Sequence, residues 1–202
     1  MKPYYKDEAC TIYHGDCREI LPTLEKVDLV LTDPPYGLNR KMQGGTWGVA
    51  YSCSDMLKWD YVLSPAEMER ILSIESKMII WGANNYSMPP SRCWLVWLKP
   101  CLATLSDVEL AWTNFDAPAK CFKNNRISKA SGHPTEKPLE LFKWCIEMSK
   151  TTDTILDPFM GSGTTLRAAK DLGRKAIGIE LEEKYCEIAA RRLEQGVLNL
   201  GI

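Results

Sequence analysis

Short apolar segments alternate along this chain with segments of helical periodicity, which is typical of an α/β protein with a mostly parallel, doubly wound sheet. Strands are predicted over residues 11–14, 27–32, 78–81, 93–98, 108–112, 154–157 and 175–179. Helices are predicted over residues 16–24, from Ser64 onward, and over 138–150, 163–172 and 182–193. Residues 1–202 are expected to form a single domain, because this length suffices for one substantial core.

The composition is that of an ordinary soluble protein, with 45% hydrophobic and 25% charged residues. No apolar run approaches the length of a membrane span, so no membrane partner is expected. The eight cysteines are scattered without a CxxC pair and there are only two histidines, so no metal site is expected. Cysteines used in this way suit a cytoplasmic protein. Because the net charge is −1, any DNA contact must come from local basic clusters.

The sequence Asp33-Pro34-Pro35-Tyr36 follows the apolar run 27–32 and is the most informative motif of the chain. Proline fixes its own φ, lacks an amide donor and holds the preceding residue extended. The backbone carbonyls and the Asp33 carboxylate therefore form a group of acceptors that suits an exocyclic NH2 group. Tyr36 adds a flat face on which a planar ring can stack. The motif predicts a slot for the amino group of a nucleobase.

A second motif runs from Asp157 to Thr165 and joins a predicted strand to a predicted helix. Its glycines allow the backbone to approach a ligand closely, and the helix N-terminus offers free amides. The motif is neither a Walker loop nor a complete GxGxxG. Glu180 ends the next predicted strand, where an acidic residue is placed to bind a ribose diol. We expect an adenosine-bearing cofactor at this loop.

The two motifs are expected to meet at one edge of the sheet. Asp33 and Asp157 both follow predicted strands. In an open parallel sheet, ligands bind outside the carboxyl ends of the strands, at the point where the strand order reverses. One motif would then hold the base and the other a methyl donor.

The motif order resembles that of the permuted β class of S-adenosylmethionine-dependent DNA amino-methyltransferases, which modify adenine N6 or cytosine N4. Four segments carry the resemblance: His14-Gly-Asp-Cys17, Asp33 to Gly37, His133-Pro-Thr-Glu-Lys-Pro138, and Asp157 to Glu180. The resemblance implies a Rossmann-like methyltransferase fold with a circularly permuted motif order. It also implies that S-adenosylmethionine is the cofactor and that no metal takes part.

The resemblance further implies roles for individual residues. Asp33, Pro34, Pro35 and Tyr36 would be catalytic and would grip a target base flipped out of the duplex. Residues in contact with the cofactor would be Asp16, Cys17, Asp33, Thr135, Lys137, Asp157, Pro158, Phe159, Gly161, Ser162, Gly163, Thr164, Thr165 and Glu180. Within this set, Glu180 would bind the ribose and Asp16 the adenine. Thr135 and Lys137 would meet the cofactor carboxylate.

Two polar segments, residues 37–54 and 114–132, flank the predicted base slot and are candidate DNA-recognition loops. Their basic candidates for DNA contact are Arg40, Lys41, Lys120, Lys123, Arg126 and Lys129. Members of the family commonly carry a larger insertion for reading the target sequence. Because this chain offers only a short one, we expect a homodimer or a short, relaxed target.

The expected activity is site-specific methylation of adenine N6 in DNA, of the kind found in restriction–modification systems, because an Asp-led motif is more usual for adenine within the family. Cytosine-N4 methylation stays open, since the same slot accepts either amine. An RNA-base amino-methyltransferase and a non-catalytic cofactor-binding regulator are further alternatives. A nucleotide-dependent oxidoreductase is disfavoured by the incomplete GxGxxG.

Overall fold

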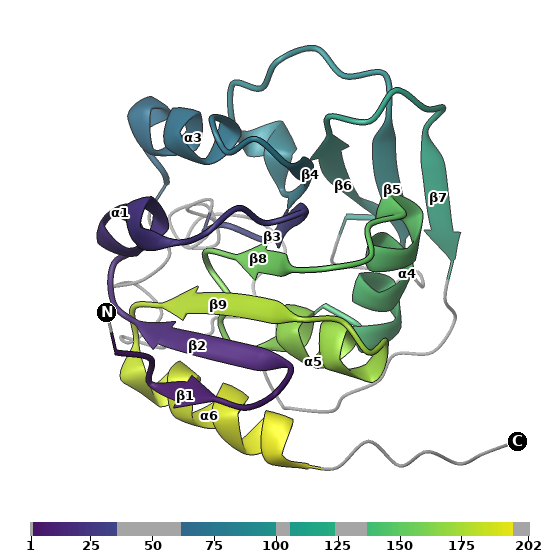
Figure 1. Cartoon of the computed structure of the whole chain (residues 1–202). Helices are drawn as coiled ribbons and strands as arrows, with labels where there is room; N and C mark the ends of the chain where they lie inside the picture. Colours follow the sequence, from purple (N-terminus) through teal and green to yellow (C-terminus); the bar gives the residue numbers. More distant parts are fainter. Residues whose placement is uncertain (1, 36–61, 100–105, 124–136, 196–202) are drawn as a thin grey trace, which may run out of the picture.

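A computed structural model of the chain describes residues 2–35, 62–99, 106–123 and 137–195. These residues build a nine-stranded sheet in the order β1-β2-β9-β8-β3-β4-β6-β5-β7 (Figure 1). The strands are β1 (Tyr5–Lys6), β2 (Cys10–His14), β3 (Leu29–Thr32), β4 (Lys77–Trp81), β5 (Trp94–Leu98), β6 (Val108–Thr113), β7 (Lys120–Lys123), β8 (Ile155–Asp157) and β9 (Ala176–Glu180). The helices are α1 (Cys17–Ile20), α3 (Pro65–Leu72), α4 (Leu139–Ser149), α5 (Thr164–Asp171) and α6 (Glu183–Glu194), with 3-10 turns η1 (Leu21–Thr23) and η3 (Ala83–Asn85).

The parallel part of the sheet contains the point at which its strand order reverses. β2, β9, β8, β3 and β4 are parallel neighbours in that order. From β3 the chain leads outward to β4, whereas from β8 it leads in the opposite direction to β9. β3 and β8 are themselves paired, with Leu29 opposite Ile155. The strand order therefore reverses between β3 and β8, which is the position at which doubly wound sheets bind their ligands.

Helices cover both faces of the sheet, as the alternation of buried strand residues requires. Leu29 and Leu31 of β3 pack into a core with α4, α5 and α6, whereas Val30 packs into a second core with α1 and α3. β4 follows the same rule, because Ile79 and Ile80 belong to opposite cores. Strands buried on both faces read as continuous apolar runs, which is why the sequence pattern predicts them well. The doubly wound Rossmann-like architecture is confirmed.

The far side of the sheet departs from the parallel pattern. β6 runs antiparallel to both β4 and β5, and β7 is an edge strand parallel to β5. The prediction of a loop over residues 114–132 was wrong at β7. Only Phe122 of this strand is partly buried, so no apolar alternation announces it. Lysines at both of its ends are typical of an edge strand protected against further pairing.

Two smaller differences concern the amino-terminal region. The helix predicted over residues 16–24 is a single α turn, α1, followed by η1, in which Pro22 lies near the start. The two-residue strand β1, which pairs antiparallel with β2, was not predicted because it is too short to show a pattern. The helix predicted from Ser64 is confirmed as α3, with a complete capping box between Ser64 and Glu67.

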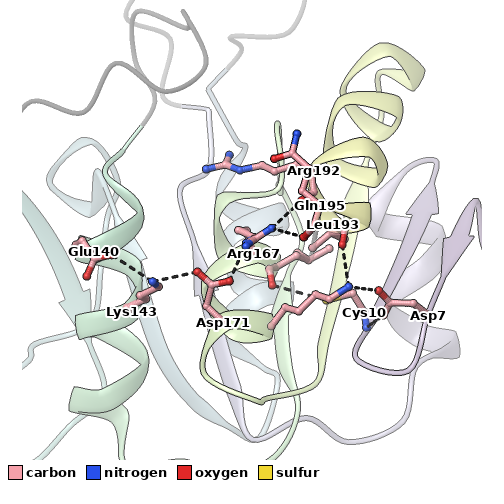
Figure 2. Close-up of polar contacts among 11 residues, drawn as sticks. Asp7, Cys10, Glu140, Lys143, Arg167, Asp171, Arg192, Leu193 and Gln195 are labelled. Carbon is pink, nitrogen blue, oxygen red and sulfur yellow. Dashed lines mark hydrogen bonds and ion pairs between the residues drawn. The ribbon is translucent and has the colours of Figure 1, made fainter. Parts of the chain in front are cut away.

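A polar network ties the last helix to the rest of the molecule (Figure 2). Arg167 of α5 donates to the backbone carbonyls of Arg192 and Gln195 at the end of α6, at 3.0 and 2.8 Å. Arg167 also pairs with Asp171 at 2.7 Å, and Asp171 pairs in turn with Lys143 of α4 at 3.0 Å. Cations near the carboxyl end of a helix donate to its last carbonyls and interact favourably with its dipole. This network therefore stabilises the packing of α6. None of the helices within the described ranges has the length and apolar character needed to cross a membrane.

Candidate active site

The ends of β3 and β8 are joined by a side-chain hydrogen bond. The Thr32 hydroxyl donates to Oδ1 of Asp157 at 2.7 Å, and both residues are buried. Asp157 also accepts from the Thr165 hydroxyl and, at 3.1 Å, from the Phe159 amide. Burial raises the pKa of the Asp157 carboxyl to about 6, against the opposing effect of these donors. The predicted base motif and the predicted cofactor loop therefore begin side by side.

Asp33 follows β3 directly, and its two carboxylate oxygens have different surroundings. Oδ2 accepts from Nζ of Lys137. Oδ1 is buried and, among the residues described, has no hydrogen-bond partner. A buried acceptor without a donor is costly, so this oxygen is available to a donor that does not come from the described residues. Burial raises the pKa of Asp33, and the Lys137 ammonium offsets part of that rise.

The backbone after Asp33 is also contacted by Tyr86, the residue that directly follows η3. The Tyr86 hydroxyl donates to the backbone carbonyl of Pro35. Gly82, which precedes η3, has a φ of 66°, and this left-handed conformation turns the chain sharply after β4. The position of the Pro34-Pro35 segment is thus fixed by a neighbouring strand end as well as by its own proline rings.

Lys137 is the centre of a chain of alternating charges. Its side chain is only 5% exposed and contacts Asp33 and Glu109, the latter at 3.3 Å. Glu109 lies on β6 and pairs with Lys99. Burial opposes ionisation of Glu109, but the two ammonium groups outweigh it and its pKa is lowered. The order of charges is therefore Asp33, Lys137, Glu109, Lys99, with the Trp81 ring 5.9 Å from the Lys137 nitrogen.

The predicted cofactor loop turns tightly after β8 and leads into α5. Gly161 and Gly163 have φ values of 49° and 79°, in the left-handed region that favours glycine. A Cβ on Gly163 would lie 2.7 Å from the Cβ of Ala189, so α5 begins in direct contact with α6. No side chain caps the start of α5, which leaves its first amides to other partners.

Glu180 closes this loop from the neighbouring strand. Its two oxygens accept from the amides of Gly161, at 3.0 Å, and Glu182, at 2.8 Å. Burial raises its pKa, although both amides act in the opposite direction. The carboxylate is therefore a fixed, partly buried acceptor at the end of β9, as expected for a group that binds a diol.

Asp16 lies at the same edge of the sheet, because His14 is paired with Glu180 in register. Its Oδ1 accepts from the Arg18 amide at 2.8 Å and caps α1. It also forms an ion pair with the Arg18 guanidinium, and the hydrogen bond from that group lowers its pKa. Cys17, the first residue of α1, is partly buried.

The structure thus gathers most of the residues proposed from the sequence at the carboxyl edge of the sheet. Lys120 and Lys123 lie on the edge strand β7. Tyr36, Arg40, Lys41, Arg126, Lys129 and Thr135 lie outside the described residues. Within the described ranges, no three His, Cys, Asp or Glu side chains cluster as metal ligands.

Sequence reasoning missed several residues of this edge, namely Thr32, Trp81, Tyr86, Lys99 and Glu109. Only Glu109 carried a usable signal, because it places a charge inside the apolar run of residues 108–112. A charge at such a position is costly unless it is paired, and here it pairs with two lysines. The hydroxyls of Thr32 and Tyr86 are ordinary in a strand and a turn, so nothing in the sequence distinguishes them.

Comparison with known proteins agrees with this geometry. A family described as DNA methylase, covering N6 and N4 methyltransferases, matches residues 81–191. The type II methyltransferase M2.LlaDCHI of Lactococcus lactis subsp. cremoris is 30% identical, over 96% of this chain and 93% of that protein. M2.DpnII of Streptococcus pneumoniae is also 30% identical, over 96% and 92%. The DNA adenine methyltransferase YhdJ of Escherichia coli (strain K12) is 26% identical, over 94% and 84%.

Solved structures show the same fold. M1.HpyAVI in complex with S-adenosylmethionine has a TM-score of 0.59 at 25% identity, over 91% of this chain and 98% of that one. The cytosine-N4-specific PvuII DNA methyltransferase has a TM-score of 0.65 at 20% identity, over 100% and 90%. The alignment with M2.LlaDCHI spans 251 positions, more than the 202 residues of this chain, so insertions separate the two proteins. The permuted motif order, the site at the β3 and β8 ends and the relatives together show that the chain belongs to the DNA methylase family of N6 and N4 methyltransferases.

Proposed function

We propose that this DNA methylase transfers a methyl group from S-adenosylmethionine to the exocyclic N6 of an adenine flipped out of DNA. The observation that carries the proposal is the buried Oδ1 of Asp33, which lacks a hydrogen-bond partner in the described part of the chain and lies next to the glycine turn that follows β8. An amine on an aromatic ring is a poor nucleophile, because its lone pair is delocalised. Acceptors for its N–H groups favour a pyramidal nitrogen and free that lone pair.

The residues of this edge divide the work between base and cofactor. S-adenosylmethionine, when bound, supplies an electrophilic methyl group on its sulfonium sulfur. The Asp33 carboxylate and the backbone carbonyls of Asp33 and Pro34 would accept from the target amine, with Tyr36 stacking on the base. Glu180 would accept from the ribose hydroxyls, while Asp16 and Cys17 would lie at the adenine. Alignment of the amine with the methyl group then provides most of the acceleration.

The remaining cofactor contacts fall on the loop and on the segment before α4. Residues 157–165 would surround the methionine portion, for which the uncapped start of α5 offers amides. Thr135 and Lys137 would meet the cofactor carboxylate. The Lys137 ammonium has Asp33 as a partner, so the same cation would link the cofactor site to the base slot.

Adenine is proposed over cytosine because the motif begins with Asp33. YhdJ, which is named as a DNA adenine methyltransferase, is similar over most of both chains and supports the choice. The likeness to the cytosine-N4-specific PvuII enzyme concerns the fold, and cytosine N4 is the second candidate. Residues 37–54 and 114–132 would contact DNA. Because this chain lacks insertions that its relatives carry, a homodimer or a short target would complete recognition.

Two isosteric variants test the division of roles. Asp33→Asn exchanges one acceptor oxygen for a donor amide, so we expect methyl transfer to DNA to be largely lost while S-adenosylmethionine still binds. Glu180→Gln removes the charge at the end of β9, so we expect the Kd for S-adenosylmethionine to rise with less effect on kcat at saturation. Titration calorimetry and transfer of a labelled methyl group measure the two quantities. Normal transfer by Asp33→Asn would refute the proposed base slot.

A further inference from the structure

Glu109 holds a position that structural stability alone does not explain. Its side chain is 25% exposed on β6, opposite Trp97 of β5 in register. It contacts two ammonium groups, those of Lys99 and Lys137, and the second of these contacts Asp33. Replacing buried charges by well-packed apolar side chains is often neutral or stabilising. This chain of partly buried charges ends at the proposed base slot, which points to a role in that slot.

The geometry defines what Glu109 does to Lys137. An ammonium has three donor positions on a flexible stem, so a lysine with one anionic partner is free to straddle both oxygens of that carboxylate. Lys137 instead lies between two carboxylates from different elements, 3.3 Å from Glu109 and in contact with Oδ2 of Asp33. Oδ1 of Asp33 has no donor among the residues that the structure describes. The second carboxylate thus restricts the ammonium to one side of Asp33.

We propose that Glu109 is a positioning residue for methyl transfer, which holds the Lys137 ammonium on Oδ2 of Asp33 so that Oδ1 is open to the target amine. The inference rests on the proposed function, in which Asp33 accepts from that amine. Lys99 contacts Glu109, so the linked side chains carry two negative and two positive charges. Neither Glu109 nor Lys99 touches the base in this account, and both act through Lys137.

The electrostatics of the slot support the same arrangement. The groups whose charges act on Asp33 are Lys137, Glu109 of β6 and Lys99 beyond β5. The Glu109 charge raises the pKa of Asp33, whereas the Lys99 charge lowers it. Asp157 of β8 also lies near, and the Asp33 charge raises the pKa of Asp157. Removing Glu109 or Lys99 must therefore shift the ionisation of Asp33 in opposite directions.

The test compares Glu109→Gln with a matched control elsewhere in the molecule. Glu109→Gln keeps the shape and one acceptor oxygen but removes the charge. Asp171→Asn is the control, because Asp171 is also a partly buried carboxylate between two cations, Lys143 and Arg167 (Figure 2). Asp171 is the last residue of α5, so it lies at the end of that helix remote from the β8 turn. kcat, the KM for S-adenosylmethionine and the pH dependence of kcat are measured for each variant on DNA.

We expect Glu109→Gln to lower kcat by about 10- to 100-fold, the loss typical of a displaced catalytic group, with a smaller change in KM. The acid limb of kcat against pH should move to lower pH in Glu109→Gln and to higher pH in Lys99→Met. Glu109→Asp, which restores the charge, should return the limb toward its wild-type position. Asp171→Asn should lower the melting temperature without changing kcat or the limb.

Three results would overturn the inference. The first is a wild-type kcat in folded Glu109→Gln, and the second is an equal loss in Asp171→Asn, which would mean a general effect of lost ion pairs. The third is a shift of the acid limb to higher pH in Glu109→Gln or to lower pH in Lys99→Met. The result for Lys99→Met decides the question even if Glu109→Gln does not fold. If one of these results is found while the wild type methylates DNA normally, the proposed function still holds. Absence of methylation by the wild type, with no S-adenosylmethionine bound, would overturn both.

Discussion

The Thr32 hydroxyl on β3 donates a hydrogen bond of 2.7 Å to the buried carboxylate of Asp157 on β8. The two residues are 125 positions apart in the chain, yet each lies at the boundary of one half of the proposed site. Thr32 is bonded directly to Asp33, and Asp157 begins the glycine turn that leads to α5. This contact joins the proposed base slot to the proposed cofactor loop, which the permuted sequence places far apart.

Thr32→Val should therefore impair methyl transfer more than cofactor binding. Valine keeps the shape but removes one of the two donors to Oδ1 of Asp157 and leaves this oxygen with the Phe159 amide, which costs about 1 kcal/mol of stability. The same change removes the hydrogen bond between the ends of β3 and β8. We expect the base slot and the cofactor loop to be less well aligned, so kcat should fall. The control is Thr113→Val, since Thr113 is also buried and its hydroxyl donates to the carbonyl of Cys93 at 2.7 Å. Equal effects on kcat in both variants would show that the Thr32 contact has no special role.

Asp157 predicts a pH dependence of stability with a definite sign. Its pKa is about 6 in the folded protein, above the value of about 3.9 for an unfolded aspartate. The folded state thus binds the proton more tightly than the unfolded state does. The resulting stabilisation is complete at a pH below the pKa of the unfolded state, and it is lost as the pH rises through the pKa of the folded state. Relative to Asp157→Asn, the wild type should lose on the order of 3 kcal/mol between about pH 4 and pH 7. Denaturant titrations of both proteins across this range measure the difference, and a constant difference would contradict the prediction.

The parallel half of the fold was predictable because its strands are buried on both faces. Residues such as Leu29, Val30 and Leu31 form an unbroken apolar run, and helices with Pro65 or Gly163 at their start carry local signals. β7 was not predictable, since an edge strand with lysines at both ends shows no alternation. At the site, the two sequence motifs identified the acceptor groups of the proposed base slot and the glycine turn of the proposed cofactor loop. Asp33, which follows β3, and Glu109 of β6 both contact Lys137, and only the folded sheet brings these two carboxylates together.

The edge strand β7 provides a test of the proposed DNA contacts. Lys123→Glu reverses a charge on a strand that ends the sheet next to residues 124–132 of the proposed recognition segment. If Lys123 contacts a phosphate, DNA affinity should fall and the slope of log K against log salt should decrease by about one. S-adenosylmethionine affinity should stay unchanged. Lys6→Glu is the matched control, because Lys6 lies exposed on β1 at the opposite edge of the sheet. Equal losses in both variants would indicate a general effect of charge rather than a contact.

Identification of the methylated base is the strongest test of the proposed activity. The purified protein is incubated with S-adenosylmethionine and unmethylated DNA, the DNA is digested to nucleosides, and the products are identified by mass spectrometry. N6-methyladenine should form with the wild type and be largely lost with Asp33→Asn, because the amine of the flipped adenine loses its acceptor at Oδ1. N4-methylcytosine as the only product, or no methylated base from a protein that binds S-adenosylmethionine, would contradict the account.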